Sequence, residues 1–206
     1  MDSRKILKMI NDGEIDKLKK MLADDIYKKE LGRSGINRYS AMKRYFKYVD
    51  TYNRATSYPA RDIEVYGERW NCFCDGYSIA LTHENIGSME CFDGEKYLDI
   101  AGIIKNFPLD YELIDINEKI ARAKSMGYKL TKKECDACKT LFFWRYKEGY
   151  WRISVIDRVF GIINDGELAQ VYYTGAKSPL YIKTGVGIAL ALPVNMKDRK
   201  GITIIE

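Results

Sequence analysis

The sequence predicts an α+β protein, and three observations support this fold class. Apolar residues recur at three- and four-residue spacing near the N-terminus, from Ile15 to Ile26, which is typical of an amphipathic helix. Two later blocks each contain a helical stretch followed by short alternating runs that are separated by glycine turns. Both blocks follow the order strand, helix, strand, strand, strand, once a short leading strand is allowed near Ile36.

The N-terminal 35 residues predict a helical hairpin. Ile6, Leu7 and Ile10 form a short apolar stripe, which Asn11-Asp12-Gly13 interrupts before the second helix. Gly32 to Gly35 ends this unit in the prediction. We expect residues 1–35 to be a separate hairpin that docks on a larger domain of residues 36–206.

The first block of that domain is predicted to be a helix followed by three strands. The helix runs from about 38 to 56, with an apolar face that includes Tyr39, Met42 and Phe46. Pro59 stops it. Residues 62–66, 70–74 and 77–81 alternate as strands, with Asp75-Gly76 a strong tight-turn signal. A short leading strand near Ile36 would complete a βαβββ unit.

The last third of the chain predicts the same order again. Residues 151–155 indicate a strand and residues 157–163 a short helix. Three further strands follow at 167–173, 180–184 and 188–194, with turns at Thr174-Gly175 and Thr184-Gly185. Between the two blocks, residues 97–104 indicate one short helix, 115–134 a basic helical stretch, and 141–146 an aromatic strand.

The composition is that of a globular protein without a membrane-spanning segment. The 206 residues are 46% hydrophobic and 31% charged, which is ordinary for a globular chain. No stretch is apolar enough to span a bilayer, and the first 22 residues carry charge throughout, unlike a signal peptide. We therefore expect a cytoplasmic protein with no membrane partner, whose five cysteines are reduced thiols.

Several short motifs resemble the bacterial replicative sliding clamp, the beta-subunit type of DNA clamp. The final segment is similar to the last strands of a clamp domain, and the first block to its hairpin and the connection after it. The matching segments are 173–175 (YTG), 178–182 (SPLYI), 191–194 (ALPV), 74–80 (CDGYSIA) and 98–104 (LDIAGII). The resemblance covers about residues 36–110 and 150–196, so residues of about 112–149 are an insertion.

The resemblance implies a fold and a class of function. It implies one clamp-like domain of two βαβββ units, and a non-catalytic accessory protein that binds double-stranded DNA and polymerase-type proteins as a processivity or docking factor. A phage or mobile element is one source that fits. One such domain cannot encircle a duplex, so a ring would require a homo-oligomer. The alternative is a structural or protein-interaction module that keeps the clamp fold without encircling DNA.

Basic helices are the candidate nucleic-acid interface, since clamps hold DNA through phosphate contacts from lysine and arginine. The net charge of +5 permits such a partner without requiring it. The candidates are Lys43, Lys47 and Arg54 from the first helix, and Lys119, Arg122 and Lys132 from the inserted stretch, where Lys124, Lys129 and Lys133 lie nearby. The alternative is a solvated helical face, which Asp50 and Glu118 also suit.

Four of the cysteine residues are candidate zinc ligands. Cys72 and Cys74, together with Cys135 and Cys138, could supply four thiolates to a tetrahedral zinc. The CxC spacing is unusual for zinc, and buried hydrophobic packing of Cys72 and Cys74 is the simpler interpretation. We therefore predict no metal and no other cofactor.

Catalytic patterns are weak, so we predict that the chain is not an enzyme. His83 is the only histidine, and it would have to serve every acid–base scheme, including any dyad with Cys91. Gly185-Val186-Gly187 lies between two strands, whereas a phosphate loop precedes a helix. The aromatic run from Phe142 to Trp151 could stack on bases, but a buried strand is favoured.

Overall fold

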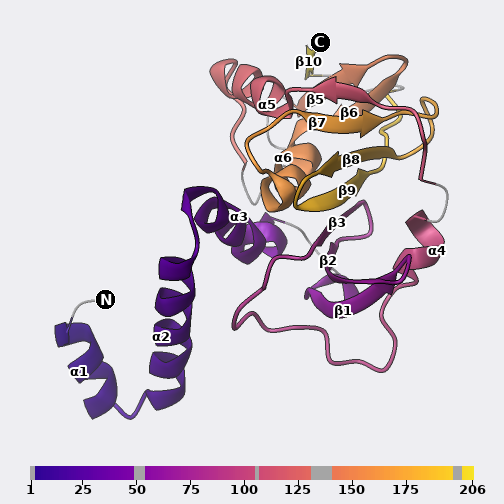
Figure 1. Ribbon diagram of the computed structural model, residues 1–206. Helices are drawn as coiled ribbons and strands as arrows, with labels where there is room; N and C mark the ends of the chain where they lie inside the picture. Colours follow the sequence, from indigo (N-terminus) through magenta and orange to yellow (C-terminus); the bar gives the residue numbers. More distant parts are fainter. Residues whose placement is uncertain (1–2, 49–53, 105–106, 131–140, 197–200) are drawn as a thin grey trace.

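The structure, a computed structural model that describes residues 3–48, 54–104, 107–130, 141–196 and 201–206, combines helices with β-sheets (Figure 1). The helices are α1 (Ser3–Asn11), α2 (Ile15–Glu30), α3 (Arg33–Arg44), α4 (Ile100–Ile104), α5 (Ile116–Ser125) and α6 (Ile153–Ile163), with 3-10 turns η1 (Tyr45–Tyr48) and η2 (Arg54–Thr56). The strands are β1 (Ala60–Val65), β2 (Glu68–Cys74), β3 (Ser78–Thr82), β4 (Glu112–Ile114), β5 (Leu141–Tyr146), β6 (Gly149–Arg152), β7 (Ala169–Tyr172), β8 (Leu180–Thr184), β9 (Gly187–Ala191) and β10 (Ile202–Ile205). The predicted α+β class is confirmed.

The larger sheet joins the two halves of the chain. Its strand order is β1-β2-β3-β9-β8-β7-β4, and every neighbouring pair is antiparallel. Each half supplies three consecutive strands that follow a helix, α3 in the first half and α6 in the second. The halves meet where β3 pairs with β9, for example at Ala80 and Ala189.

The expected leading strand near Ile36 is wrong, because Ile36 lies inside α3. The expected bounds of this helix, 38 to 56, are also wrong. Gly32 is its N-cap, and the α-helical part ends at Arg44 before η1. Gly35 lies inside the helix and does not end the previous unit, and a Cβ there would lie only 3.0 Å from Leu31 Cδ2. The close approach of Leu31 therefore explains why residue 35 is a glycine, although the sequence suggested that this glycine ends the N-terminal hairpin.

Helix α6 begins at Ile153, so the prediction of a strand at 151–155 is wrong beyond Arg152. The β-branched residues at its start favour a strand locally. Burial overrides that preference, because Ile153, Ile156 and Phe160 recur at helical spacing and are all buried. Strand β6 precedes α6 in the chain, but it pairs within the smaller sheet and not with β7, β8 and β9.

Two apolar clusters lie on opposite faces of the large sheet. Phe73 on β2 packs into the cluster beneath α3 and α6, whereas its neighbours Cys72 and Cys74 face the second cluster. The connection between β3 and β4 supplies the cover of that second face, where Ile100 and Ile104 of α4 are buried. This alternation follows from the period of two in a strand.

A second, smaller sheet has the order β10-β5-β6, and of its strands only β5 lies wholly within the expected insertion. Strand β5 pairs antiparallel with β6 and parallel with β10, which the sequence did not predict. Phe143, Trp144 and Trp151 are fully buried, so the predicted core role of the aromatic run is confirmed. Strand β4, also unpredicted, adds to the edge of the large sheet beside β7.

Helices α1 and α2 extend away from the sheets in Figure 1. Met9 and Leu18 are their buried apolar residues. The C-terminal part of α2 contacts the rest of the chain: the Tyr27 hydroxyl donates to the backbone oxygen of Asn85 at 2.6 Å, and Asp24 accepts from Tyr39 at 2.6 Å. The division into residues 1–35 and 36–206 stays a prediction, and its boundary falls within α3.

Candidate nucleic-acid interface

The helices beside the large sheet carry a concentrated positive charge. Helices α3, α5 and α6 with the turn η1 contain nine lysine or arginine residues and two acidic residues, a net charge of +7. The whole chain has a net charge of +5, so the remaining residues are slightly acidic in sum. Helix α6 contacts both α3 and α5, which places these cations in one helical layer.

A groove of about 530 Å³ lies within this layer. Its wall residues come from α3 on one side and α5 on the other, with α6 beneath them. Gly161 of α6 allows close packing there, because a Cβ at this position would lie 3.2 Å from Ala41 of α3. The lining residues are Ser34, Asn37, Arg38, Ala41, Arg44, Tyr45, Asn117, Ile120, Ala121, Lys124, Leu130, Asp157, Arg158, Phe160, Gly161, Asn164 and Gly166.

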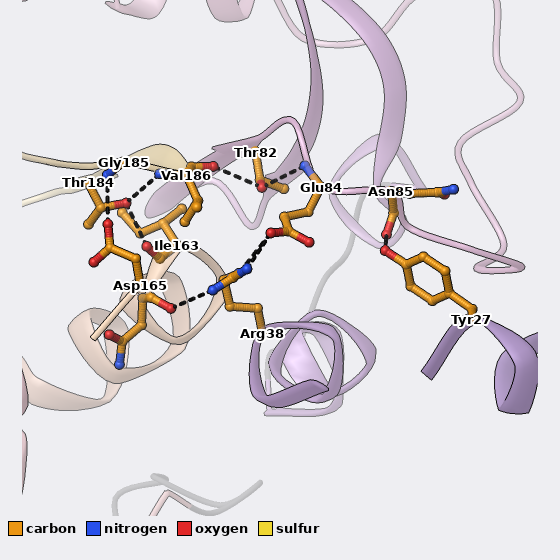
Figure 2. Close-up of polar contacts among 11 residues, drawn as sticks. Tyr27, Arg38, Thr82, Glu84, Asn85, Ile163, Asp165, Thr184, Gly185 and Val186 are labelled. Carbon is orange, nitrogen blue, oxygen red and sulfur yellow. Dashed lines mark hydrogen bonds and ion pairs between the residues drawn. The ribbon is translucent and has the colours of Figure 1, made fainter. Parts of the chain in front are cut away.

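Arg38 is held in the wall of the groove by acceptors from two distant segments (Figure 2). Its guanidinium forms an ion pair with Glu84, with Nε 3.1 Å from Oε1, and donates from Nη1 to the backbone oxygen of Asn164 at 3.2 Å. Glu84 is itself placed by a hydrogen bond from its backbone N–H to Thr82 Oγ1 at 3.0 Å. These contacts tie α3 to the end of β3 and the end of α6.

The other groove cations differ in how far their charge is compensated. Arg158 Nη2 donates to the buried carboxylate of Asp75 at 3.0 Å. Lys124 lies 3.9 Å from Asp157, and its side chain is 56% exposed. Arg44 is exposed, and its Nε donates to the backbone oxygen of Ser40 at 3.0 Å. No acidic side chain in the described part of the chain pairs with Arg44.

The structure separates the predicted interface residues into two places. Lys43 forms an ion pair with Asp24 of α2, and Lys47 is exposed on the following turn. Lys119 and Arg122 both point to the backbone oxygen of Glu206, at 3.1 and 3.5 Å. Arg54 begins η2, and Lys132 lies outside the described residues, as do Lys133 and Asp50.

Sequence reasoning overlooked Arg38, Arg44 and Arg158, which line the groove. The sequence does contain a periodic pattern that marks the groove residues of α3. The positions 34, 37, 38, 41, 44 and 45 recur at three- and four-residue spacing, on a different face from buried Tyr39 and Met42. No local signal could have revealed that Arg158 and the α5 residues lie beside this stripe.

Cys72 and Cys74 behave as buried hydrophobic residues. Burial raises the pKa of the Cys72 thiol well above its usual value and that of Cys74 to about 11, so neither is primed to lose a proton to a metal. Cys135 and Cys138 lie outside the described residues. Among the residues that the structure describes, no group of three or more His, Cys, Asp or Glu could hold a metal ion.

His83 is occupied by local contacts. Its ring stacks on Trp70 with centroids 3.6 Å apart, and its Nε2 lies 3.4 Å from a carboxylate oxygen of Glu68. Cys91 instead accepts a hydrogen bond from Arg61 Nε at 3.1 Å. Neither residue lines the groove, so the structure does not support a His83–Cys91 dyad there.

Within the described ranges, no helix is both long and apolar enough to cross a membrane. No protein-family model matches the chain, and no curated protein sequence does.

A solved structure does share the fold. The crystal structure of a "Putative DNA polymerase III beta subunit" from Eubacterium rectale ATCC 33656 superposes with a TM-score of 0.53 at 14% sequence identity. The match covers 79% of this chain and 64% of that protein, so the chain spans less than two thirds of the length of the protein it resembles. At this identity the likeness concerns the fold alone. The fold predicted from the turn and strand motifs is confirmed: the chain has the fold of a DNA sliding clamp.

Proposed function

We propose that this protein is a non-catalytic, clamp-like docking factor that contacts duplex DNA through its helical layer. The observation that carries the proposal is the net charge of +7 on α3, η1, α5 and α6, in a chain whose total is +5. Phosphates attract such a layer without regard to base sequence, and the release of counterions makes the binding salt-dependent. The likeness to a DNA polymerase III beta subunit supports the same class of partner.

The proposal includes the predicted residues of the layer. Exposed Lys47 and Arg44 contact phosphates directly, and Lys119 and Arg122 contribute from α5. Lys43 contributes less, because Asp24 compensates its charge. We place the protein in the cytoplasm, with polymerase-type proteins as its further partners.

The edges of the large sheet favour a docking role over a closed ring. Strand β1 is one edge, and it carries an irregular register between Ala60 and Ile63 and a positive φ of 52° at Asp62. Strand β4, the other edge, has only three residues. Bulged, charged or very short edges resist pairing with another chain. We therefore propose that ring closure would need contacts other than continuous pairing at these edges.

Duplex binding at several salt concentrations tests the proposal. The triple variant Arg33→Gln, Arg44→Gln, Lys47→Gln removes three exposed cations of the layer, and the logarithmic salt slope should fall by about 0.9 for each phosphate that the variant no longer neutralises. A control with the same charge change is Lys96→Gln, Lys177→Gln, Lys183→Gln, whose positions lie outside these helices. Equal weakening in both variants, or no DNA retention by the native chain at low salt, would contradict the proposal.

A protein-interaction module is the second candidate, and α1 and α2 favour it. Their exposed apolar side chains include Leu7, which is 60% exposed, and Ile26, which is 58% exposed. Ile10, Ile15 and Leu22 are also exposed. Apolar residues gathered on exposed helices are typical of a docking surface. A monomer that shows no DNA retention at low salt would favour this function.

A further inference from the structure

We propose that the groove between α3, α5 and α6 is a binding site for a phosphate ester. This inference deepens the DNA proposal and rests on it only for the biological source of the phosphate. The groove volume of about 530 Å³ is that of a site for one small ligand. Such sites are typically about 300–1,000 Å³ and hold a few well-placed polar groups. A duplex would lie across the layer, whereas this groove admits a single nucleotide-sized group.

Arg44 and Lys124 are the groove cations whose charged groups are best able to bind a ligand. Only the Nε of Arg44 has a hydrogen-bond acceptor within the described residues, which leaves its two terminal nitrogens for a ligand. Within the described part of the chain, Lys124 makes a long ion-pair contact of 3.9 Å with Asp157, and its side chain is 56% exposed. They stand on the two helices that wall the groove, α3 and α5. A guanidinium fork matches two phosphate oxygens, and an ammonium adds a third contact.

Buried Arg158 lines the floor of the groove, where Asp75 compensates its charge. Its side chain is 9% exposed, and although Nη2 is paired with Asp75, its buried Nε has no acceptor among the described residues. A buried N–H without an acceptor leaves local positive potential uncompensated. Arg158 therefore contributes to the groove a buried donor that has no acceptor among the described residues.

The remaining polar groups of the groove give it a fixed shape. The amides of Asn117 and Asn164 bond to each other at 2.7 Å, which connects α5 to the end of α6. Asp157 is the carboxylate in the lining, and it is engaged by Lys124 and by the Tyr128 hydroxyl at 3.2 Å. The hydrogen bond from Tyr128 holds part of the Asp157 charge in the wall of the groove, so Asp157 opposes an incoming anion less than a carboxylate without a donor would.

Titration of the full-length, ¹⁵N-labelled chain at low salt tests the site. Inorganic pyrophosphate, thymidine monophosphate and an eight-residue single strand of dT serve as probes, with sodium glutamate as the carboxylate control. Saturable shifts are expected at Arg44, Lys124 and Arg158. Tighter binding of the strand assigns the phosphate to a nucleic acid, and tighter binding of the monophosphate assigns it to a free nucleotide. Absent saturation, or equal binding of glutamate, overturns the proposal.

Matched variants separate the groove from the helical layer as a whole. Arg44→Gln and Lys124→Gln should each weaken phosphate binding about tenfold, the effect of removing a hydrogen bond to a charged group. Arg33→Gln and Lys129→Gln remove the same charges at exposed positions outside the groove and should change it by less than about twofold. Equal weakening by both pairs overturns the site.

A second pair of variants keeps every cation in place. Ala121→Glu adds a negative charge to the groove, whereas Ser125→Glu adds it one turn later on α5, outside the lining. Only Ala121→Glu should abolish pyrophosphate binding, and circular dichroism should show both variants folded. If duplex retention fails while pyrophosphate still binds, the DNA proposal is wrong and the groove stands. The reverse result contradicts the groove alone.

Discussion

Asp75 and Arg158 form a buried ion pair between the β2–β3 turn and helix α6, with Arg158 Nη2 3.0 Å from Asp75 Oδ2. The other carboxylate oxygen accepts from the backbone N–H groups of Tyr77 and Ser78, at 2.9 and 2.7 Å. The Asp75 side chain has no exposed surface, so its charge depends on these donors. The pair therefore fixes the first half of the sheet to the helix of the second half.

Arg158→Met should lower the free energy of unfolding by about 3–5 kcal/mol, because it leaves the Asp75 carboxylate buried without its partner. Urea unfolding followed by tryptophan fluorescence measures the change. The double variant Asp75→Asn, Arg158→Met should recover part of it, since no buried charge remains and the asparagine oxygen still accepts from the turn. A decrease below about 1 kcal/mol in the single variant would show that water reaches the pair.

At Gly187 the two halves of the sheet and α6 lie close together. A Cβ there would lie 2.4 Å from the backbone oxygen of Leu81 and 2.5 Å from Ile163 Cγ2. Gly187→Ala should therefore destabilise the fold by about 1–3 kcal/mol through overpacking. Gly185→Ala is the matched control, since a Cβ there meets only the side chain of Asp165, at 3.1 Å. Thermal unfolding of both variants checks the prediction, and equal destabilisation would contradict it.

The two strand triplets could be predicted because their signals are local. Residues alternate between the sheet faces, and turn residues such as Gly76, with φ of 84°, mark the ends. Strands β4 and β10 were missed for the opposite reason. Each has only three or four residues and exists through a partner far away in the sequence, β7 for one and β5 for the other. Such pairing leaves no periodic pattern in so short a segment.

The sequence predicts which helices of the candidate site are basic, but not which of their charges are paired, because that depends on contacts between distant segments. That α3 and α5 are basic can be counted from the sequence, and Lys43, Lys47, Lys119 and Arg122 do lie on or beside those helices. Which of these charges is compensated depends on acids from distant segments. Asp24 lies on the preceding helix and is the partner of Lys43, a pairing that only the tertiary structure reveals.

The cysteines of β2 should be chemically inert in the folded protein. Burial raises the pKa of Cys74 to about 11 and that of Cys72 well above its usual value, so at pH 8 both remain thiols, which alkylate poorly. Cys91 is partly exposed and should react faster with iodoacetamide. Peptide mass spectrometry after timed alkylation distinguishes the three sites. In urea the rates should converge, and equal rates in the native state would mean that β2 opens readily.

The docking of α2 should depend on pH through Asp24. Burial raises the pKa of this carboxyl, but hydrogen bonds from Lys43, Tyr39 and Ser88 together outweigh burial and lower it below the usual 3.8. Because the folded pKa is the lower one, the stabilisation is fully present above the unfolded pKa, and it is lost as the pH falls through the folded pKa.

Asp24→Asn should therefore loosen α2 near neutral pH and make little difference in strong acid. Hydrogen exchange of α2 amides, read by mass spectrometry from pH 3 to pH 7 after correction for intrinsic rates, measures this. The native chain and the variant should differ at pH 5–7 and converge toward pH 3. Asp16→Asn is the control, since the Asp16 side chain is 97% exposed and its contact with Lys19 spans 4.0 Å. A difference that persists unchanged at pH 3 would mean that the Asp24 contacts act through packing rather than charge.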